Sequence, residues 1–193
     1  MKFPKVPSDQ SMRWVQNPPC YIRFKGVWDM QDLYERLVDW FRKRKYKFHE
    51  KIYKHKHPSP FGVERQYIWA ADREVEDYLQ THYEIYFHTY DAHDIEVIQP
   101  DGSKKIFTKG RIWVELRNWL NLDWEERWNA SSFYAHLKSF YNKYVFRKRF
   151  EQGWAPRMRY ELYDLHALIK RILKMENDQY EFMYGGGYHR RIP

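Results

Sequence analysis

The sequence predicts an α+β fold: a single, mostly antiparallel sheet of about six to seven strands, with one N-terminal helix and two C-terminal helices packed on one face. Apolar residues recur at helical spacing near residue 30 and again in the last third of the chain. Between them, from about residue 46 to 119, apolar and polar residues alternate in short segments separated by turn residues. Because no helical segment interrupts these strands, neighbouring strands are expected to pair antiparallel.

The first helix is predicted to begin after Asp29, a favourable N-cap, with Asp32 in the first turn where the helix dipole favours negative charge. A short strand at residues 21–27 is expected to precede it. The apolar face of this helix recurs every three or four residues and comprises Met30, Leu33, Tyr34, Leu37, Val38 and Phe41.

From Tyr46 the spacing changes from helical to alternating. Alternation predicts one strand face with Tyr46, Phe48 and Ile52, and an opposite face with Lys47, His49, Lys51, Tyr53 and His55. Further strands are predicted at residues 65–71, 81–90, 95–99, 105–108 and 111–119, with a hairpin turn at residues 100–103. We expect Leu33, Leu37 and Phe41 of the first helix to be buried against Tyr83, Ile85 and Phe87.

Two C-terminal helices are predicted, separated by Gly153 and Pro156. The first follows a cap at Ser131 or Ser132, and its apolar stripe is Phe133, Tyr134, Leu137, Phe140, Tyr141, Tyr144 and Val145. The stripe of the second is Met158, Leu162, Leu165, Ile169, Ile172 and Leu173. The tryptophans expected to seal the junction between sheet and helices are Trp113, Trp119, Trp124 and Trp128.

The chain of 193 residues has the size of one domain. We predict an extended N-terminal arm at residues 1–20, one α+β domain at residues 21–176 and a flexible C-terminal tail at residues 177–193. No apolar run approaches the roughly 20 residues of a transmembrane helix, and no secretory leader is recognisable. Cys20 is the only cysteine, which excludes an intrachain disulfide. These features predict a cytoplasmic protein without a transmembrane segment.

The composition combines 20% aromatic residues with a net charge of +8. Aromatic side chains fill cores and stack on flat ligands, whereas an excess of cations attracts polyanions. The charge is uneven, because Lys and Arg predominate before residue 63 and after residue 130, whereas Asp and Glu predominate between them. Either the surface is polarised, or the basic ends neutralise the acidic middle within the fold.

The strongest predicted binding site is the basic segment that leaves the first helix and continues into the next strand. Its alternating lysines and rings suit a groove in which cations neutralise phosphates and aromatic rings stack on bases. The alternative is a solvated sheet face whose lysines protect an edge strand from aggregation. The predicted nucleic-acid-binding residues are Arg42, Lys43, Arg44, Lys45, Lys47, Lys51, Tyr53, Lys54, His55 and Lys56.

No nucleophile elbow, P-loop or dinucleotide-binding glycine-rich turn is present. The acidic groups Asp72, Glu74, Glu76, Asp77 and Asp91, Asp94, Glu96 are expected in loops, and no metal, cofactor or catalytic residue is predicted. We therefore predict a non-catalytic protein that binds RNA or single-stranded nucleic acid. The alternatives are an assembly protein that contacts a protein partner or its own copy, or a binder of an apolar ligand with a helix-grip-like arrangement.

Overall fold

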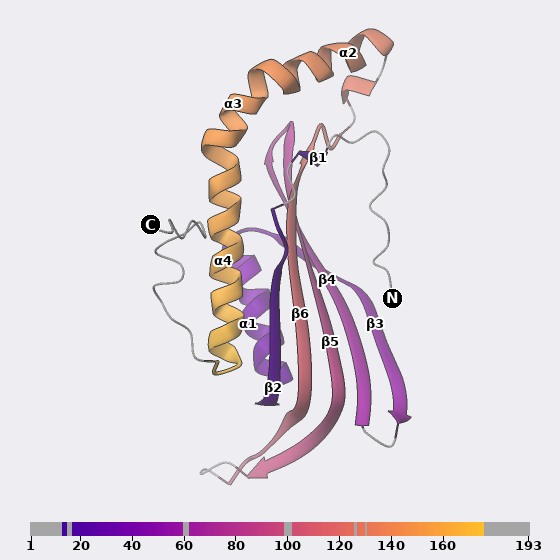
Figure 1. The fold of residues 1–193 in the computed structure, drawn as a ribbon, viewed down its shortest axis with the longest axis vertical. Coiled ribbons are helices and arrows are strands. Elements are labelled where there is room, and N and C mark those ends of the chain that lie inside the picture. The colour runs from indigo at the N-terminus through magenta and orange to yellow at the C-terminus, as the bar shows by residue number, and fades with distance from the viewer. Residues whose placement is uncertain are drawn as a thin grey trace, which may run out of the picture.

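The computed structural model describes residues 13–14, 17–59, 62–98, 102–125, 127–129 and 131–175 (Figure 1). Within these residues, a single antiparallel sheet contains six strands in the order β1-β6-β5-β4-β3, and β2 also pairs with β6. Because β1 and β2 share one edge of β6, the six strands occupy five positions across the sheet. The predicted single antiparallel sheet is confirmed. Its strands are β1 (Arg13–Trp14), β2 (Cys20–Trp28), β3 (Lys47–Ser59), β4 (Gly62–Glu76), β5 (Leu79–Ile98) and β6 (Lys104–Leu122).

Helix α1 (Met30–Lys43) begins as its sequence predicts, because the Asp29 carboxylate accepts a hydrogen bond from the Asp32 backbone N–H at 3.0 Å. Its apolar face is buried in the main core, together with side chains from β2, β4, β5 and β6. The expected partners are confirmed there, since Leu33, Leu37, Phe41, Tyr83, Ile85 and Phe87 are all at most 1% exposed.

The long strands β5 and β6 each contain two of the predicted strands. The interruption in β5 is a bulge and not a turn, because Tyr90 pairs with Arg111 and the next pair is His93 with Lys109. Two glycines of the flanking strands make room for it. A Cβ on Gly110 would lie 2.9 Å from the Tyr90 carbonyl oxygen, and a Cβ on Gly62 would lie 2.7 Å from the carbonyl carbon of Asp91.

Replacing Gly110 by alanine is expected to lower the free energy of unfolding by about 1 to 3 kcal/mol, since the new methyl group meets backbone atoms that cannot move aside independently. Chemical denaturation measures the loss. Gly153→Ala is the matched control, because a Cβ there has no atom within 4 Å and the residue is helical. That substitution should stabilise the protein or leave its stability unchanged. Equal losses for both variants would contradict the steric explanation.

The two predicted C-terminal helices are present as α2 (Ser132–Phe140) and α4 (Ala155–Ile172), and short helical segments join them into one bent path (Figure 1). Pro156 lies in the first turn of α4, where the missing N–H is tolerated, so the second helix begins near Pro156 as predicted. Gly153 lies inside a π-helical turn and does not interrupt the helical path. In order, the path comprises α2 (Ser132–Phe140), a π-helical segment (Tyr141–Phe146), α3 (Arg147–Arg149), a second π-helical segment (Phe150–Trp154) and α4 (Ala155–Ile172).

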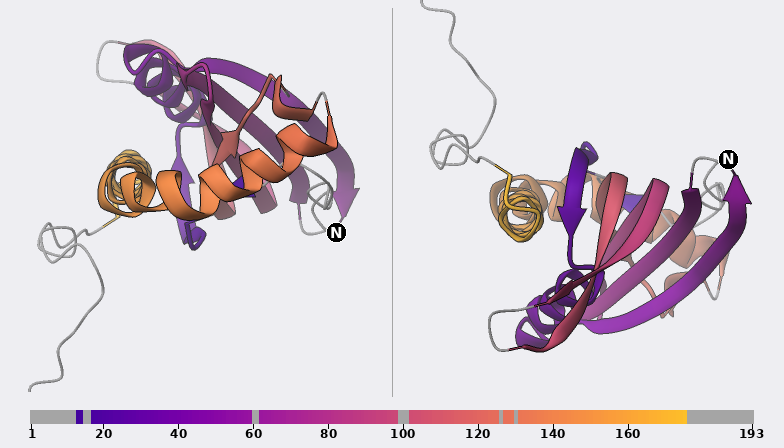
Figure 2. Two further views of the ribbon diagram at one scale, coloured as in Figure 1. Left: turned by 90° about the horizontal axis from the view of Figure 1, so that it is seen from above. Right: turned by 90° about the horizontal axis from the view of Figure 1, so that it is seen from below.

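Helices α1 and α4 lie on the same face of the sheet (Figure 2). The predicted core of α4 is confirmed, because Leu162, Leu165 and Ile169 are fully buried. By contrast, α2 passes the end of the sheet and does not cover that face (Figure 1). The prediction that both C-terminal helices pack on one face therefore holds for α4 and is wrong for α2.

Helix α2 and the π-helical segment after it turn polar side chains inward and their apolar stripe outward. Lys138 is buried and pairs with Asp123 at 2.8 Å, and Asn142 accepts a hydrogen bond from the Tyr78 hydroxyl at 2.6 Å. Phe146, on the same side, joins a second core cluster with Leu79, Leu120, Leu122 and Met158. These polar partners at the end of the sheet fix the helix in an orientation that its apolar pattern alone did not predict.

None of the helices among the described residues is long and apolar enough to cross a membrane. The predicted arm before residue 13 and the predicted tail at residues 177–193 lie outside the described residues. Within the predicted arm, Arg13 and Trp14 pair with Asn121 and Leu120 of β6.

Candidate functional site

The face of the sheet opposite α1 and α4 carries most of the polar and charged side chains of the strands. We call it the open face. Along β6, Ile112, Val114 and Leu116 belong to the core, so the alternate residues of this strand point to the open face. The same alternation in β2 places Ile22 in the core and exposes its neighbours Tyr21 and Arg23.

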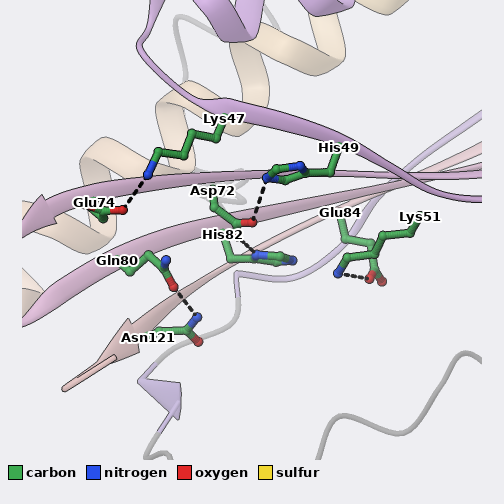
Figure 3. Close-up of polar contacts among 9 residues, drawn as sticks. All are labelled: Lys47, His49, Lys51, Asp72, Glu74, Gln80, His82, Glu84 and Asn121. Carbon is green, nitrogen blue, oxygen red and sulfur yellow. Dashed lines mark hydrogen bonds and ion pairs between the residues drawn. The ribbon is translucent and has the colours of Figure 1, made fainter. Parts of the chain in front are cut away.

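The β3 side of the open face holds the lysines that the sequence singled out, and acidic residues of β4 and β5 neutralise them (Figure 3). Lys47 Nζ lies 2.8 Å from Glu74 Oε1, and Lys51 Nζ lies 3.9 Å from Glu84 Oε2. His49 also faces a carboxylate, with its Nε2 4.0 Å from Asp72 Oδ2. Here basic residues from the N-terminal part of the chain pair with acidic residues from its middle. This pairing is what the second interpretation of the uneven charge predicted, in which the basic ends neutralise the acidic middle within the fold.

A bulge in β3 separates the predicted stacking ring from the lysines. The register of β3 shifts between Glu50 and Ile52, so Tyr53 lies on the opposite face of the sheet from Lys51. Tyr53 stacks on Tyr67 with a centroid distance of 5.0 Å, and Tyr67 packs against the core. The prediction that Lys47, Lys51 and Tyr53 share one face is therefore wrong, as is the placement of Ile52 with Phe48.

The remaining predicted binding residues lie at the end of α1 and further along β3. Arg42 and Lys43 end α1, and Arg44 packs over the Trp40 ring at 3.9 Å while pairing with Asp164 at 3.6 Å. Further along β3, the backbones of Lys54, His55 and Lys56 pair with those of Gln66, Arg65 and Glu64. Among the side chains that the structure describes in the segment 42–56, the cations are thus not gathered into one groove.

The centre of the open face is a buried polar network on β4, β5 and β6. The Asp72 carboxylate contacts His82 Nδ1, and the His82 ring lies 4.0 Å from the Trp119 ring, centroid to centroid. Nearby, the Glu64 carboxylate lies 2.5 Å from His88 Nε2. At the edge of the network in Figure 3, Gln80 accepts a hydrogen bond from Asn121 at 3.1 Å.

The surroundings of Tyr86 in this centre disfavour the charged form of its phenol. Burial, then the neighbouring Tyr90 and Glu64, raises the pKa of Tyr86 to about 12.

Two of the four predicted junction tryptophans also lie on this face. Trp113 pairs in register with His88, and Trp119 with His82. The predicted seal between sheet and helices is therefore wrong for these two, whereas Trp128 does stack on Tyr141 of the C-terminal helical path.

Cations without acidic partners gather on the other side of the open face, where β2, β6 and β5 lie side by side. Register pairs place Arg23 beside Trp113, and Lys25 beside Arg111. Among the described residues, no carboxylate lies within 4.0 Å of the charged atoms of Arg23, Lys25 or Lys109. Arg111 pairs with Asp91 at 2.5 Å. We call Arg23, Lys25, Lys109 and Arg111 the basic groove.

Two adjoining pockets with volumes of about 430 and 780 Å³ lie along the basic groove and share Lys25 and Arg111 in their walls. Aromatic rings flank the cations. Tyr21 is 52% exposed and stacks nearly parallel on Trp113, with a centroid distance of 6.3 Å and an interplanar angle of 16°. The Arg111 guanidinium carbon lies 5.8 Å from the centroid of the Tyr90 ring. Cations that alternate with exposed rings are the elements of a single-strand binding surface.

The acidic groups expected in loops lie mainly in strands, because β4 extends to Glu76 and β5 to Ile98. Several carboxylates there pair with cations, as Asp94 does with Arg65 at 2.5 Å. Within the described part of the chain, no three His, Cys, Asp or Glu side chains are grouped so that they could hold a metal ion. A scan against models of protein families and a search of curated proteins both find no match for this chain.

Proposed function

We propose that the protein is a non-catalytic binding protein that holds RNA or another single-stranded nucleic acid along the basic groove. The observation that carries this proposal is the set of cations on two paired strands, Arg23, Lys25 and Lys109, which have no acidic partner among the described residues. They stand next to the exposed ring of Tyr21, which stacks on the partly buried ring of Trp113.

The proposed site differs from β3 in its charge balance. A lysine that already contacts a carboxylate, as Lys47 contacts Glu74, must exchange that partner for a phosphate and gains little from the exchange. An unpaired cation gains the full interaction and releases a counterion from the nucleic acid. Tyr21 adds a sequence-tolerant stacking surface, worth about 1 to 3 kcal/mol per stacked base.

The alternative of an apolar ligand between sheet and helix gains no support from the packing. The space between β5, β6 and α4 is filled by core side chains such as Ile85, Leu116 and Leu165. Both pockets at the basic groove lie instead along the cations of the open face.

The triple variant Arg23→Gln/Lys25→Gln/Lys109→Gln is expected to bind a labelled single-stranded oligouridylate at least about tenfold more weakly than the wild type at low salt. Fluorescence anisotropy titrations at several salt concentrations measure the effect. Because each single-strand phosphate contact contributes about 0.7 to the salt dependence, the slope of log Kd against log salt should also fall by about 2.

The matched control removes the same amount of charge from the β3 side. Lys47→Gln/Lys51→Gln/Lys54→Gln should weaken binding by less than about threefold, since carboxylates already neutralise Lys47 and Lys51. Equal losses in both triple variants would mean that net charge alone governs binding. A larger loss in the β3 variant would place the site on the segment singled out by the sequence. Absence of binding by the wild type at low salt would overturn the proposal altogether.

A further inference from the structure

The outer surface of α2 and the adjoining π-helical segment is apolar and exposed. We call its six side chains the aromatic stripe: Phe133, Tyr134, Leu137, Phe140, Tyr144 and Val145. Phe133 is 70% exposed and Phe140 57% exposed, and Phe140 lies against Tyr144 with a centroid distance of 4.9 Å. A contiguous exposed apolar surface of this kind marks an interaction site.

The opposite side of the same helix prevents the aromatic stripe from turning inward. Lys138 and Asp123 form an ion pair in which both side chains are at most 6% exposed. Asn142 bonds to Tyr78, and Phe146 is buried in the second core cluster. Rotating the helix to bury Phe133 would expose Phe146 and leave Asp123 buried without its cation, so the stripe faces outward in the folded protein.

The charge of this helical segment has one sign. No Asp or Glu occurs from residue 127 to residue 150. The exposed cations around the stripe include Lys143 and Lys148, whose amines have no carboxylate within 4.0 Å among the described residues. Arg147 and Arg149 also lie here and pair with Glu151 and Glu76. An apolar surface bordered by cations complements a surface that is apolar inside and anionic at its boundary.

We propose that the aromatic stripe docks the protein onto an anionic lipid bilayer, with α2 lying along the membrane surface. Helices that bind in this way place aromatic and aliphatic side chains among the acyl chains and lysines at the headgroups. Leu137 and Val145 have no flat ring to stack on a nucleobase, which disfavours nucleic acid as the occupant. A second copy would bring Lys143 and Lys148 close to their counterparts, which disfavours self-association through this face.

The docking surface lies apart from the basic groove. Figure 1 shows α2 beyond the end of the sheet where β1 pairs, at the opposite end from the β5–β6 hairpin. Lys25 and Lys109 of the basic groove lie toward that hairpin, since Lys109 is only five residues from the start of β6. The two surfaces can therefore be tested independently in the full chain.

Vesicle flotation with the full chain tests the proposal, using phosphatidylcholine vesicles with and without phosphatidylserine. We expect partitioning into the mixed vesicles that is at least about fivefold stronger than into phosphatidylcholine alone. Phe133→Ser/Phe140→Ser should lower that partitioning at least about tenfold. Removing one Phe ring from the apolar part of the bilayer is enough to cause a loss of this size. Tyr160→Ser is the matched control, because Tyr160 is a 54% exposed ring on α4, and it should change partitioning by less than about twofold.

The cations provide a second test. Lys143→Gln/Lys148→Gln should weaken binding to the mixed vesicles by about tenfold or more and leave the residual binding to phosphatidylcholine unchanged. The triple variant of the basic groove should bind mixed vesicles as the wild type does. This outcome separates membrane docking from the proposed nucleic-acid binding, since either can fail without the other.

Three results would overturn the proposal. The first is a wild-type protein that does not float with phosphatidylserine vesicles. The second is a Phe133→Ser/Phe140→Ser variant that floats as well as the wild type. The third is a dimer in light scattering that this variant dissociates, with no vesicle binding, which would assign the aromatic stripe to a second copy. Circular dichroism should show native helix content in each variant, because the substituted side chains are exposed.

Discussion

Replacing Lys138 by methionine is expected to lower the free energy of unfolding by about 3 to 5 kcal/mol, because the substitution leaves the Asp123 carboxylate buried without its cation. Both side chains are almost inaccessible, at 6% and 2% exposure, and the ammonium lies 2.8 Å from the carboxylate. Methionine fills a similar volume, so the loss reports the charge and not a cavity. Urea denaturation monitored by tryptophan fluorescence measures it.

Two further variants show whether the ion pair is the cause. Lys143→Met removes an exposed lysine from the same helical path and should change stability by less than about 0.5 kcal/mol. Lys138→Met/Asp123→Asn removes both charges and should regain most of the loss, since the unpaired carboxylate is gone. An unchanged stability in Lys138→Met would show that α2 does not depend on Asp123 for its orientation.

Leu37→Ala should lower the free energy of unfolding by about 2 to 5 kcal/mol, since it removes buried apolar surface and leaves a cavity between α1 and the sheet. Leu37 is fully buried in the same cluster as Ile85 and Leu165, which come from β5 and α4. The cavity would therefore lie where the elements of the main core meet. Chemical denaturation provides the measurement.

Lys43→Ala is the control for this variant, because Lys43 lies on the same helix and is exposed. Its effect should stay below about 0.5 kcal/mol. Comparable losses in Leu37→Ala and Lys43→Ala would mean that the buried face of α1 has been assigned incorrectly.

Local patterns were sufficient for the elements whose stability depends on nearby residues and on burial of one face. Asp29 and the spacing of Leu33, Leu37 and Phe41 located α1 and its buried side, and the alternation around Ile85 located its partner strand. The local patterns did not predict the bulges near Lys51 and Asp91. A bulge depends on space offered by neighbouring strands, as Gly62 and Gly110 offer it, and that space is not visible in a one-dimensional pattern.

In the candidate site, too, some features were visible in the sequence and others depend on which strands are neighbours. The lysines of β3 stand out because they are contiguous in sequence, yet Glu74 and Glu84 of other strands neutralise two of them. The basic groove is built from two short alternations, Tyr21 to Lys25 and Lys109 to Trp113, which are far apart in the chain. Each alternation was visible as part of a strand, but its significance came only from the pairing of β2 with β6.

The sequence by itself determined the α+β class, the single antiparallel sheet, the start of α1 and the buried faces of α1 and α4. These features follow from periodicity and capping, which act within a few residues along the chain. Only the tertiary structure decided which cations keep an acidic partner and which side of α2 faces outward. Both depend on groups distant in sequence, such as Glu74 beside Lys47 and Asp123 beside Lys138, because charge pairing and burial act through space.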